Sequence, residues 1–308
     1  MKSYIKIVIC GLLLLSVYSC NNQDSFTESI FGDVPVLDST AATYPFDKWL
    51  YDTYMVPYNL EFLYKMQDVG SDISFNLVPA TLDKSEILAV LVKYLWFDVY
   101  SKVVSEEFLK YNGPRIIHLI GSAAYYPNSS IYILGTAEGG MKVTLYTVNQ
   151  LDTKNMNFLN DNYFHVMHHE FTHILNQKKS FPKDFETFSA GYYDPAGWNN
   201  RTESQAASIG CISTYASAEP REDIAETISL YITMSDAQWK AKLALAANPG
   251  TDIIPNNLTI QGDSIIKLKL AMCGKWLKES WNVDLKALHD EVQEREKHID
   301  EVLTQKYW

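Results

Sequence analysis

The sequence has few cysteines, and their positions leave little room for cysteine chemistry. Of four in 308 residues, Cys10 lies in an apolar run near the start and Cys20 lies just after that run. Only Cys211 and Cys273 remain in the rest of the chain. Two cysteines can form one pair but no disulfide framework, and they cannot build a cysteine-based zinc site. A disulfide-built scaffold is therefore excluded.

Basic residues are also scarce. The chain has 26 Lys and Arg against 37 Asp and Glu, a net charge of −11. Removing residues 1–19 would remove Lys2 and Lys6 and no acid, which gives 24 − 37 = −13. A chain this acidic repels polyanions, so nucleic acid is not expected as a partner. The glycine-rich "GTAEGG" (135–140) lacks the Gly-Lys-Ser/Thr ending of a phosphate loop and predicts a hairpin turn instead.

The N-terminus has the pattern of an export signal. In "MKSYIKIVICGLLLLSVYSC" the apolar run from 7 to 17 is too short to span a membrane, and "SVYSC" resembles a bacterial lipobox. This pattern predicts a lipoprotein signal peptide over 1–19, lipidation of Cys20 and membrane attachment through that lipid. The polar residues of 20–35 then form a tether. The alternative is an ordinary signal peptide that ends near a cysteine.

Hydrophobic periodicity predicts one domain over 36–308, with an N-terminal α+β subdomain to about 178 and a helical C-terminal subdomain. The runs "PRIIHLIGSA", "SSIYILGTA" and "MKVTLYTVN" are β-branched and separated by turn residues, which predicts a three-strand meander. The fold class is therefore α+β. Helical spacing predicts helices over 82–104, 160–178, 203–209, 221–234, 236–247, 260–281 and 284–304.

The stretch "NYFHVMHHEFTHILNQ" (162–177) carries the chemistry. At about 100° per residue, one face of a helix is apolar and the opposite face carries three histidines spaced four apart. The apolar face consists of Phe164, Met167, Phe171, Ile174 and Leu175, and the histidine face of His165, His169 and His173. Histidines one turn apart can hold one metal ion between them.

Spacing selects one histidine pair. Glu170 follows His169, so His169 and His173 form the H-E-x-x-H pattern of two zinc ligands and a general base. The pair that begins at His165 has Val166 in that place, which cannot take a proton. His168 lies beside the apolar face and is expected in the core. The alternative for the whole cluster is surface histidines without a metal.

A catalytic zinc needs a third protein ligand. The metzincin continuation fails, because Asn176 and Lys179 stand where it requires Gly and His. In "STYASAEPREDIAETISLY", Glu222 and Glu226 lie four apart on one helix face, so one can bind the metal while the other accepts a hydrogen bond from a ligand histidine. The alternative is a solvated helix start, where acids favour the helix dipole.

This second motif, Tyr-x6-Glu-x3-Glu from Tyr215, resembles that of the lethal-factor-type zinc proteases among the gluzincins. The resemblance implies Glu222 as the third zinc ligand, Glu226 as the acceptor for a ligand histidine and Tyr215 as a donor to the developing oxyanion. Asp223 is the alternative third ligand. His165 is then a neighbour of the site or a residue of the cleft.

A closer resemblance covers nearly the whole chain after the signal. "FDKWLYDTYMVPYN", "LGTAEGGMKVTLYTVN", "HHEFTHILNQ" and "EDIAETISLYI" resemble the zinc-binding metallopeptidases described as substrate-import-associated zinc metallohydrolase lipoproteins. This resemblance implies a zincin-like fold and one Zn²⁺ per chain. It also implies an outer-membrane or cell-surface lipoprotein of a diderm bacterium, with a periplasm-facing anchor as the alternative. The implied partners are a TonB-dependent transporter and its surface binding lipoprotein.

The predicted activity is hydrolysis of a peptide or protein substrate, with Glu170 as the base. A substrate strand is expected along a sheet edge, for which "MKVTLYTV" is the candidate by fold analogy. Two alternatives stay open. One is a zinc hydrolase of a non-peptide amide or ester, and the other is a non-catalytic binding lipoprotein of the import complex.

Overall fold

The computed structural model describes residues 37–66, 74–125, 132–133, 135–138, 141–255 and 257–308, in two units, Met1–Tyr44 and Pro45–Trp308. The predicted signal peptide, Cys20 and the tether lie outside the described residues. In the first unit, the Asp38 carboxylate accepts a hydrogen bond of 2.9 Å from the backbone of Thr40. Among the described residues, no helix is both long and apolar enough to span a membrane.

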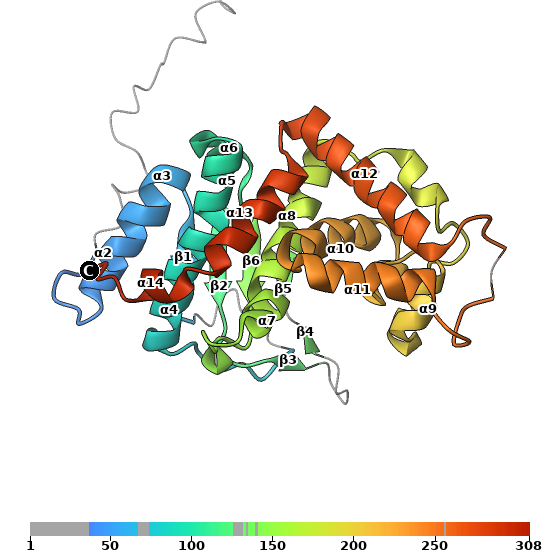
Figure 1. The fold of residues 1–308 in the computed structure, drawn as a ribbon. Helices are drawn as coiled ribbons and strands as arrows, with labels where there is room; N and C mark the ends of the chain where they lie inside the picture. Colours follow the sequence, from blue (N-terminus) through green and yellow to red (C-terminus); the bar gives the residue numbers. More distant parts are fainter. Residues whose placement is uncertain (1–36, 67–73, 126–131, 134, 139–140, 256) are drawn as a thin grey trace, which may run out of the picture. The chain divides into compact units, whose positions relative to one another are not determined.

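The second unit contains a small mixed sheet. Its strand order, among the residues described, is β1-β2-β6-β5, and β3 and β4 form a separate two-stranded ribbon (Figure 1). β1, β2 and β6 run parallel, whereas β5 is antiparallel to β6. The α+β class is thus confirmed. The strands are β1 Glu61–Leu63, β2 Ile116–Leu119, β3 Ala124–Tyr125, β4 Tyr132–Ile133, β5 Gly135–Glu138 and β6 Lys142–Leu145.

The predicted meander is wrong, because β2 and β6 pair in parallel with Ile117 opposite Val143. The expectation that "MKVTLYTV" forms a sheet edge is also wrong. β6 is an interior strand between β2 and β5, and the described pairs of β5 are with β6 alone. β-branched runs predict which residues are extended, but they carry no information about the partner strand. The chain between β2 and β6 first forms the ribbon and β5, so β6 returns in the same direction as β2.

The predicted helices are confirmed within a few residues of their expected ends, except that the last one divides into α13 and α14. The segment expected over 82–104 is a continuous run of α4, the π-helical turn η2 and α5. The helices that bear on the site are α4 Leu82–Val92, η2 Lys93–Phe97, α5 Asp98–Val103, α6 Glu106–Asn112, α8 His165–Lys178, α9 Glu203–Ser208, α10 Pro220–Thr233, α11 Asp236–Ala247, α12 Gly262–Trp281, α13 Leu285–Glu296 and α14 Ile299–Leu303. The remaining helical elements are α2 Tyr44–Leu50, η1 Tyr51–Met55, α3 Val56–Tyr58, η3 Val148–Gln150, α7 Met156–Leu159, η4 Asn160–Phe164, η5 Lys183–Thr187, η6 Trp198–Asn200 and η7 Tyr215–Ser217.

The apolar face of α8 packs into an aromatic core. All five residues of the predicted stripe are buried, and the rings of Trp96 and Phe171 meet edge to face with centroids 5.3 Å apart. His168 is in this core, as predicted, where Tyr100 Oη and His168 Nδ1 lie 3.0 Å apart. Burial lowers the pKa of His168 to about 3, so this imidazole is neutral.

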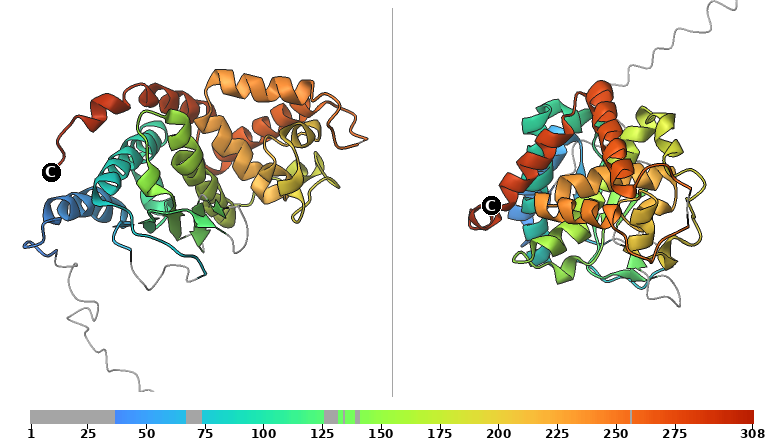
Figure 2. Two further views of the ribbon diagram at one scale, coloured as in Figure 1. Left: turned by 90° about the horizontal axis from the view of Figure 1, so that it is seen from below. Right: turned by 45° about the vertical axis from the view of Figure 1, so that its right-hand side comes forward.

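Two contacts fix the position of α8. β5 passes so close to it that a Cβ on Gly135 would lie 2.1 Å from Val166 Cγ1, which explains a glycine at the start of that strand. On the side away from the sheet α8 packs along α10, and α10 in turn contacts α12 and α13 (Figures 1 and 2). The histidine face of α8 therefore meets the acidic face of α10.

Candidate metal centre

Three of the predicted ligands converge where α8 and α10 meet. His169 Nε2 lies 3.1 Å from His173 Nε2 and 3.0 Å from Glu222 Oε2, and His173 Nε2 lies 3.3 Å from the same carboxylate oxygen. The two histidines are one turn apart on α8, and Glu222 stands in the first turn of α10, just after Pro220. Residues 49 positions apart in the chain thus form one triangle of donor atoms.

The triangle has the size of a zinc site. Zinc–nitrogen and zinc–oxygen bonds of about 2.0–2.1 Å in a tetrahedron place neighbouring donors about 3.3 Å apart. The three edges of 3.0, 3.1 and 3.3 Å therefore fit an ion seated on this face with only small adjustments. Two imidazoles and a carboxylate leave the fourth tetrahedral position open, as in catalytic zinc sites.

Glu226 orients the central ligand. Its Oε1 lies 2.8 Å from His169 Nδ1 and also 2.8 Å from His165 Nε2. Its other oxygen accepts a hydrogen bond of 2.6 Å from Ser213 Oγ. Because a neutral imidazole carries one N–H, donation from Nδ1 to Glu226 leaves the Nε2 lone pair directed at the triangle. His165, predicted as a neighbour of the site, thus lies on Glu226 and contacts the same oxygen as His169.

The cluster attracts positive charge. Burial alone would lower the pKa of His169, but the Glu222 and Glu226 carboxylates outweigh it and raise that pKa to about 10. Burial would raise the pKa of Glu222, but its contacts with His169 and His173, whose rings can donate to it when they are protonated, hold that pKa below its ordinary value. The two carboxylates favour a positive charge beside them, which protonation of His169 can provide. A divalent cation bound to the same donors can provide that charge in place of the proton.

Tyr215 and Glu170 complete the surroundings. The Tyr215 ring stacks on His169, with centroids 5.8 Å apart and planes at 23°. Burial, and then the charge and hydrogen bond of Glu222, raise the pKa of Tyr215, so its hydroxyl keeps its proton. Glu170 is half-buried on α8, and its charge acts on both His169 and Tyr215. The Tyr215 ring thus lies against the central donor His169, and the Glu170 carboxylate lies one residue after that donor on α8.

Asp223 points elsewhere. It is fully buried, with Oδ2 2.5 Å from Lys269 Nζ, and it accepts a hydrogen bond of 2.8 Å from the Tyr193 hydroxyl. Lys269 is the residue that sequence reasoning missed here, and a lysine in an amphipathic helix gives no sign that it is buried. Cys211 and Cys273 lie near this pair as free, buried thiols.

Ser213 was also missed. Serine is common in loops, and no spacing pattern ties position 213 to a carboxylate on the following helix. Its hydrogen bond depends on how the loop before η7 returns toward α10, which is a matter of tertiary structure.

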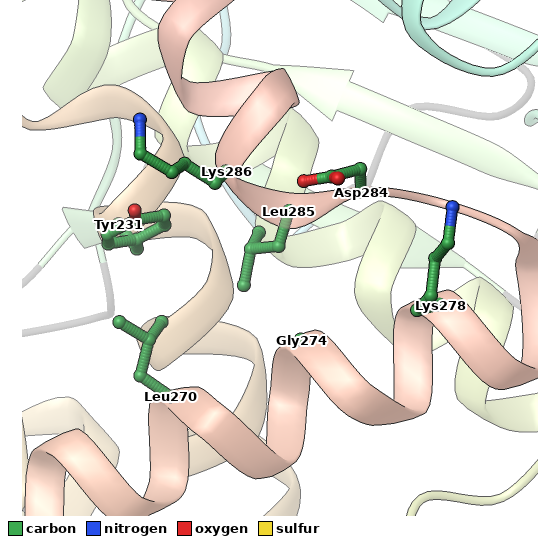
Figure 3. A pocket seen from close by; sticks show the side chains of 7 residues that line it. All are labelled: Tyr231, Leu270, Gly274, Lys278, Asp284, Leu285 and Lys286. Atoms are coloured by element: carbon green, nitrogen blue, oxygen red, sulfur yellow. The ribbon is translucent and has the colours of Figure 1, made fainter.

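A hollow of about 330 Å³ lies elsewhere, between α10, α12 and the start of α13 (Figure 3). Leu270 and Leu285 face each other across it, and Tyr231 closes one side. The Lys286 ammonium at its rim is 2.5 Å from Asp290. None of the three converging donors lines this hollow, so the chemistry of the metal centre does not extend to it.

The whole chain was also compared with known proteins. Residues 39–286 match the model of a family described as "Putative zinc-binding metallo-peptidase". A solved structure, the 2.10 Å crystal structure of a "putative zinc-binding metallo-peptidase" from Bacteroides caccae ATCC 43185, is 41% identical with a TM-score of 0.71. The match covers 87% of this chain and 97% of that one. No curated protein matches the chain.

Proposed function

This chain belongs to the family described as "Putative zinc-binding metallo-peptidase", and from that premise we propose that it hydrolyses peptide bonds with one zinc ion. The observation that carries the proposal is the triangle of His169, His173 and Glu222 donor atoms with Glu170 on the same helix. A second group of potential donors, His165, His169 and Glu226, shares His169 with the first. Since His169 donates through Nδ1 to Glu226, we assign a single ion to the chain.

The residues divide the reaction between them. When bound, zinc supplies Lewis-acid activation of a water and of the substrate carbonyl. Glu170 takes the proton from the attacking water and delivers it to the leaving amine nitrogen. The Tyr215 hydroxyl donates to the oxygen that becomes negative as the carbonyl carbon turns tetrahedral. Glu226 keeps His169 in the tautomer and orientation that ligation requires.

The proposal is tested by incubating the zinc-loaded protein with a proteome-derived peptide library and analysing the products by mass spectrometry. We expect cleavage that stops when a chelator removes the metal and returns when zinc is restored. Stoichiometric zinc with no peptide cleavage would favour a non-peptide amide or ester as substrate. No cleavage of peptides, amides or esters would favour a binding lipoprotein with a non-catalytic zinc.

We further propose that the protein is a surface lipoprotein anchored through Cys20 and works beside a TonB-dependent transporter and its binding lipoprotein. The lipobox-like "SVYSC" and the family resemblance support this placement. Cys20→Ala should move the protein from the membrane fraction to the soluble fraction. The control Cys10→Ala, in the apolar run, should stay with the membrane. A Cys20→Ala protein that remains anchored would refute lipidation at this residue.

A further inference from the structure

Trp198 extends an aromatic row that begins at a metal donor. The Tyr215 ring stacks on His169, and Trp198 meets Tyr215 with ring centroids 4.8 Å apart and planes at 63°. Trp198 lies on the short helix η6 and is half-buried, so part of its indole remains open to solvent. An aromatic surface is thus available one side chain away from the proposed oxyanion donor.

The loop that carries Trp198 is tied down by hydrogen bonds. The backbone N–H of Asp194 donates to Ser217 O at 2.9 Å, which joins the loop to η7, the element of Tyr215. The Asp194 carboxylate accepts a bond of 2.9 Å from the Gly197 N–H, and a Cβ on Gly197 would lie 2.3 Å from that carboxylate. Arg201 donates to Tyr192 O at 2.6 Å and to Ser217 O at 3.3 Å. Trp198 is therefore held at a fixed place beside Tyr215.

Packing of the interior does not account for this tryptophan. In the described part of the chain, the buried apolar side chains form three clusters. Trp198 belongs to none of them, and it is not among the partly buried side chains that pack against them. A rigid, partly exposed aromatic ring gives a large apolar contact at a low cost in conformational entropy, which is why such rings are enriched at binding surfaces. The position of Trp198 therefore suggests contact with substrate.

The charges nearby indicate what kind of side chain Trp198 would meet. Glu170, Glu222 and Glu226 surround the centre, and the chain as a whole carries −11, so an acidic side chain would be repelled. The Arg201 guanidinium, the basic group of this loop, is directed at backbone carbonyls. An apolar ring or branched aliphatic group suits the indole face better than an acidic group does.

We propose that Trp198 forms the apolar wall of a substrate subsite, and that the protein prefers peptides with an aromatic or large aliphatic side chain next to the scissile bond. This inference rests on the proposed peptidase function. It assigns to Trp198 a role in specificity, separate from the proton transfers of Glu170 and Tyr215.

The test uses two peptides that differ only in Phe or Ala next to the bond that the protein cleaves. We expect the wild type to favour the Phe peptide by about tenfold in kcat/KM, equivalent to about 1.4 kcal/mol. Trp198→Ala should reduce this preference to within about twofold, by raising KM for the Phe peptide while the Ala peptide is little affected. Trp198→Phe should retain most of the preference. Tyr111→Ala, an exposed aromatic on α6, is the control and should change neither value.

Zinc content is measured for every variant. Equal losses on both peptides after Trp198→Ala, or a loss of zinc, would mean that Trp198 only supports Tyr215, and would overturn the inference. A preference that survives Trp198→Ala would overturn it as well. Either of these outcomes would overturn only the role of Trp198, because the wild type would still cleave peptides as the proposed function requires. A wild type that cleaves no peptide would overturn the proposed function, and the inference with it.

Discussion

Replacing Glu170 by Gln should lower kcat/KM for peptide cleavage by about 10²- to 10⁴-fold, the range typical of a lost general base. The amide has the shape of the carboxylate but cannot accept the proton of the attacking water. The donor triangle does not include Glu170, so zinc binding should persist and the loss should appear in kcat. The measurement is steady-state cleavage of a fluorogenic peptide, with zinc quantified on the same samples.

Glu186→Gln is a suitable control, because Glu186 is an exposed glutamate on η5 and the change in charge is the same. It should leave kcat/KM within about twofold of the wild type, since surface substitutions have small effects. A Glu170→Gln protein that binds zinc fully and cleaves at a rate close to the wild type would contradict the assignment of the base. Another proton acceptor would then have to be found around the triangle.

Sequence alone could predict the part of the site whose residues lie on a single helix, which are His169, Glu170 and His173 on α8. The helical period places Phe171 and the other apolar residues on one face of α8 and the histidines on the opposite face. Among the histidines four residues apart, only His169 and His173 have a carboxylate, that of Glu170, directly after the first histidine. The same reasoning placed Glu222 and Glu226 on one face of α10. Their contacts with His169 follow from the packing of α8 along α10, which the pattern of neither helix predicts by itself.

The errors and omissions have the same physical origin. The sequence predicts a meander because strand propensity is local, whereas the pairing of β2 with β6 depends on contacts between distant segments. The sequence allows Asp223 as an alternative ligand because nothing local shows that its carboxylate turns toward Lys269. No sequence pattern marks Trp198 as part of the site, because its contact with Tyr215 depends on a loop that hydrogen bonds of Asp194 and Arg201 hold in place.

Replacing Lys269 by Met should destabilise the protein by about 3–5 kcal/mol, because it leaves the buried Asp223 carboxylate without its partner. Both side chains are fully buried, and the ammonium also donates to Ser189 Oγ at 2.7 Å and to Gly210 O at 2.8 Å. Burial would lower the pKa of Lys269, but Asp223 outweighs it and holds that pKa above its ordinary value. Tm should fall by about 10 °C, measured by calorimetry alongside denaturant unfolding.

Lys267→Met is the matched control on the same helix. Lys267 pairs with Asp263 at 2.6 Å, but its side chain is 57% exposed, so its loss should cost at most about 1 kcal/mol.

If Lys269→Met does not fold, the double variant with Asp223→Asn removes the unpaired charge and should recover part of the stability. Because Asp223 adjoins Glu222 on α10, the single variant should also bind zinc more weakly than the double variant does, as measured by competition with a chromophoric chelator. A Lys269→Met protein as stable as Lys267→Met would show that the buried pair does not hold this end of α10.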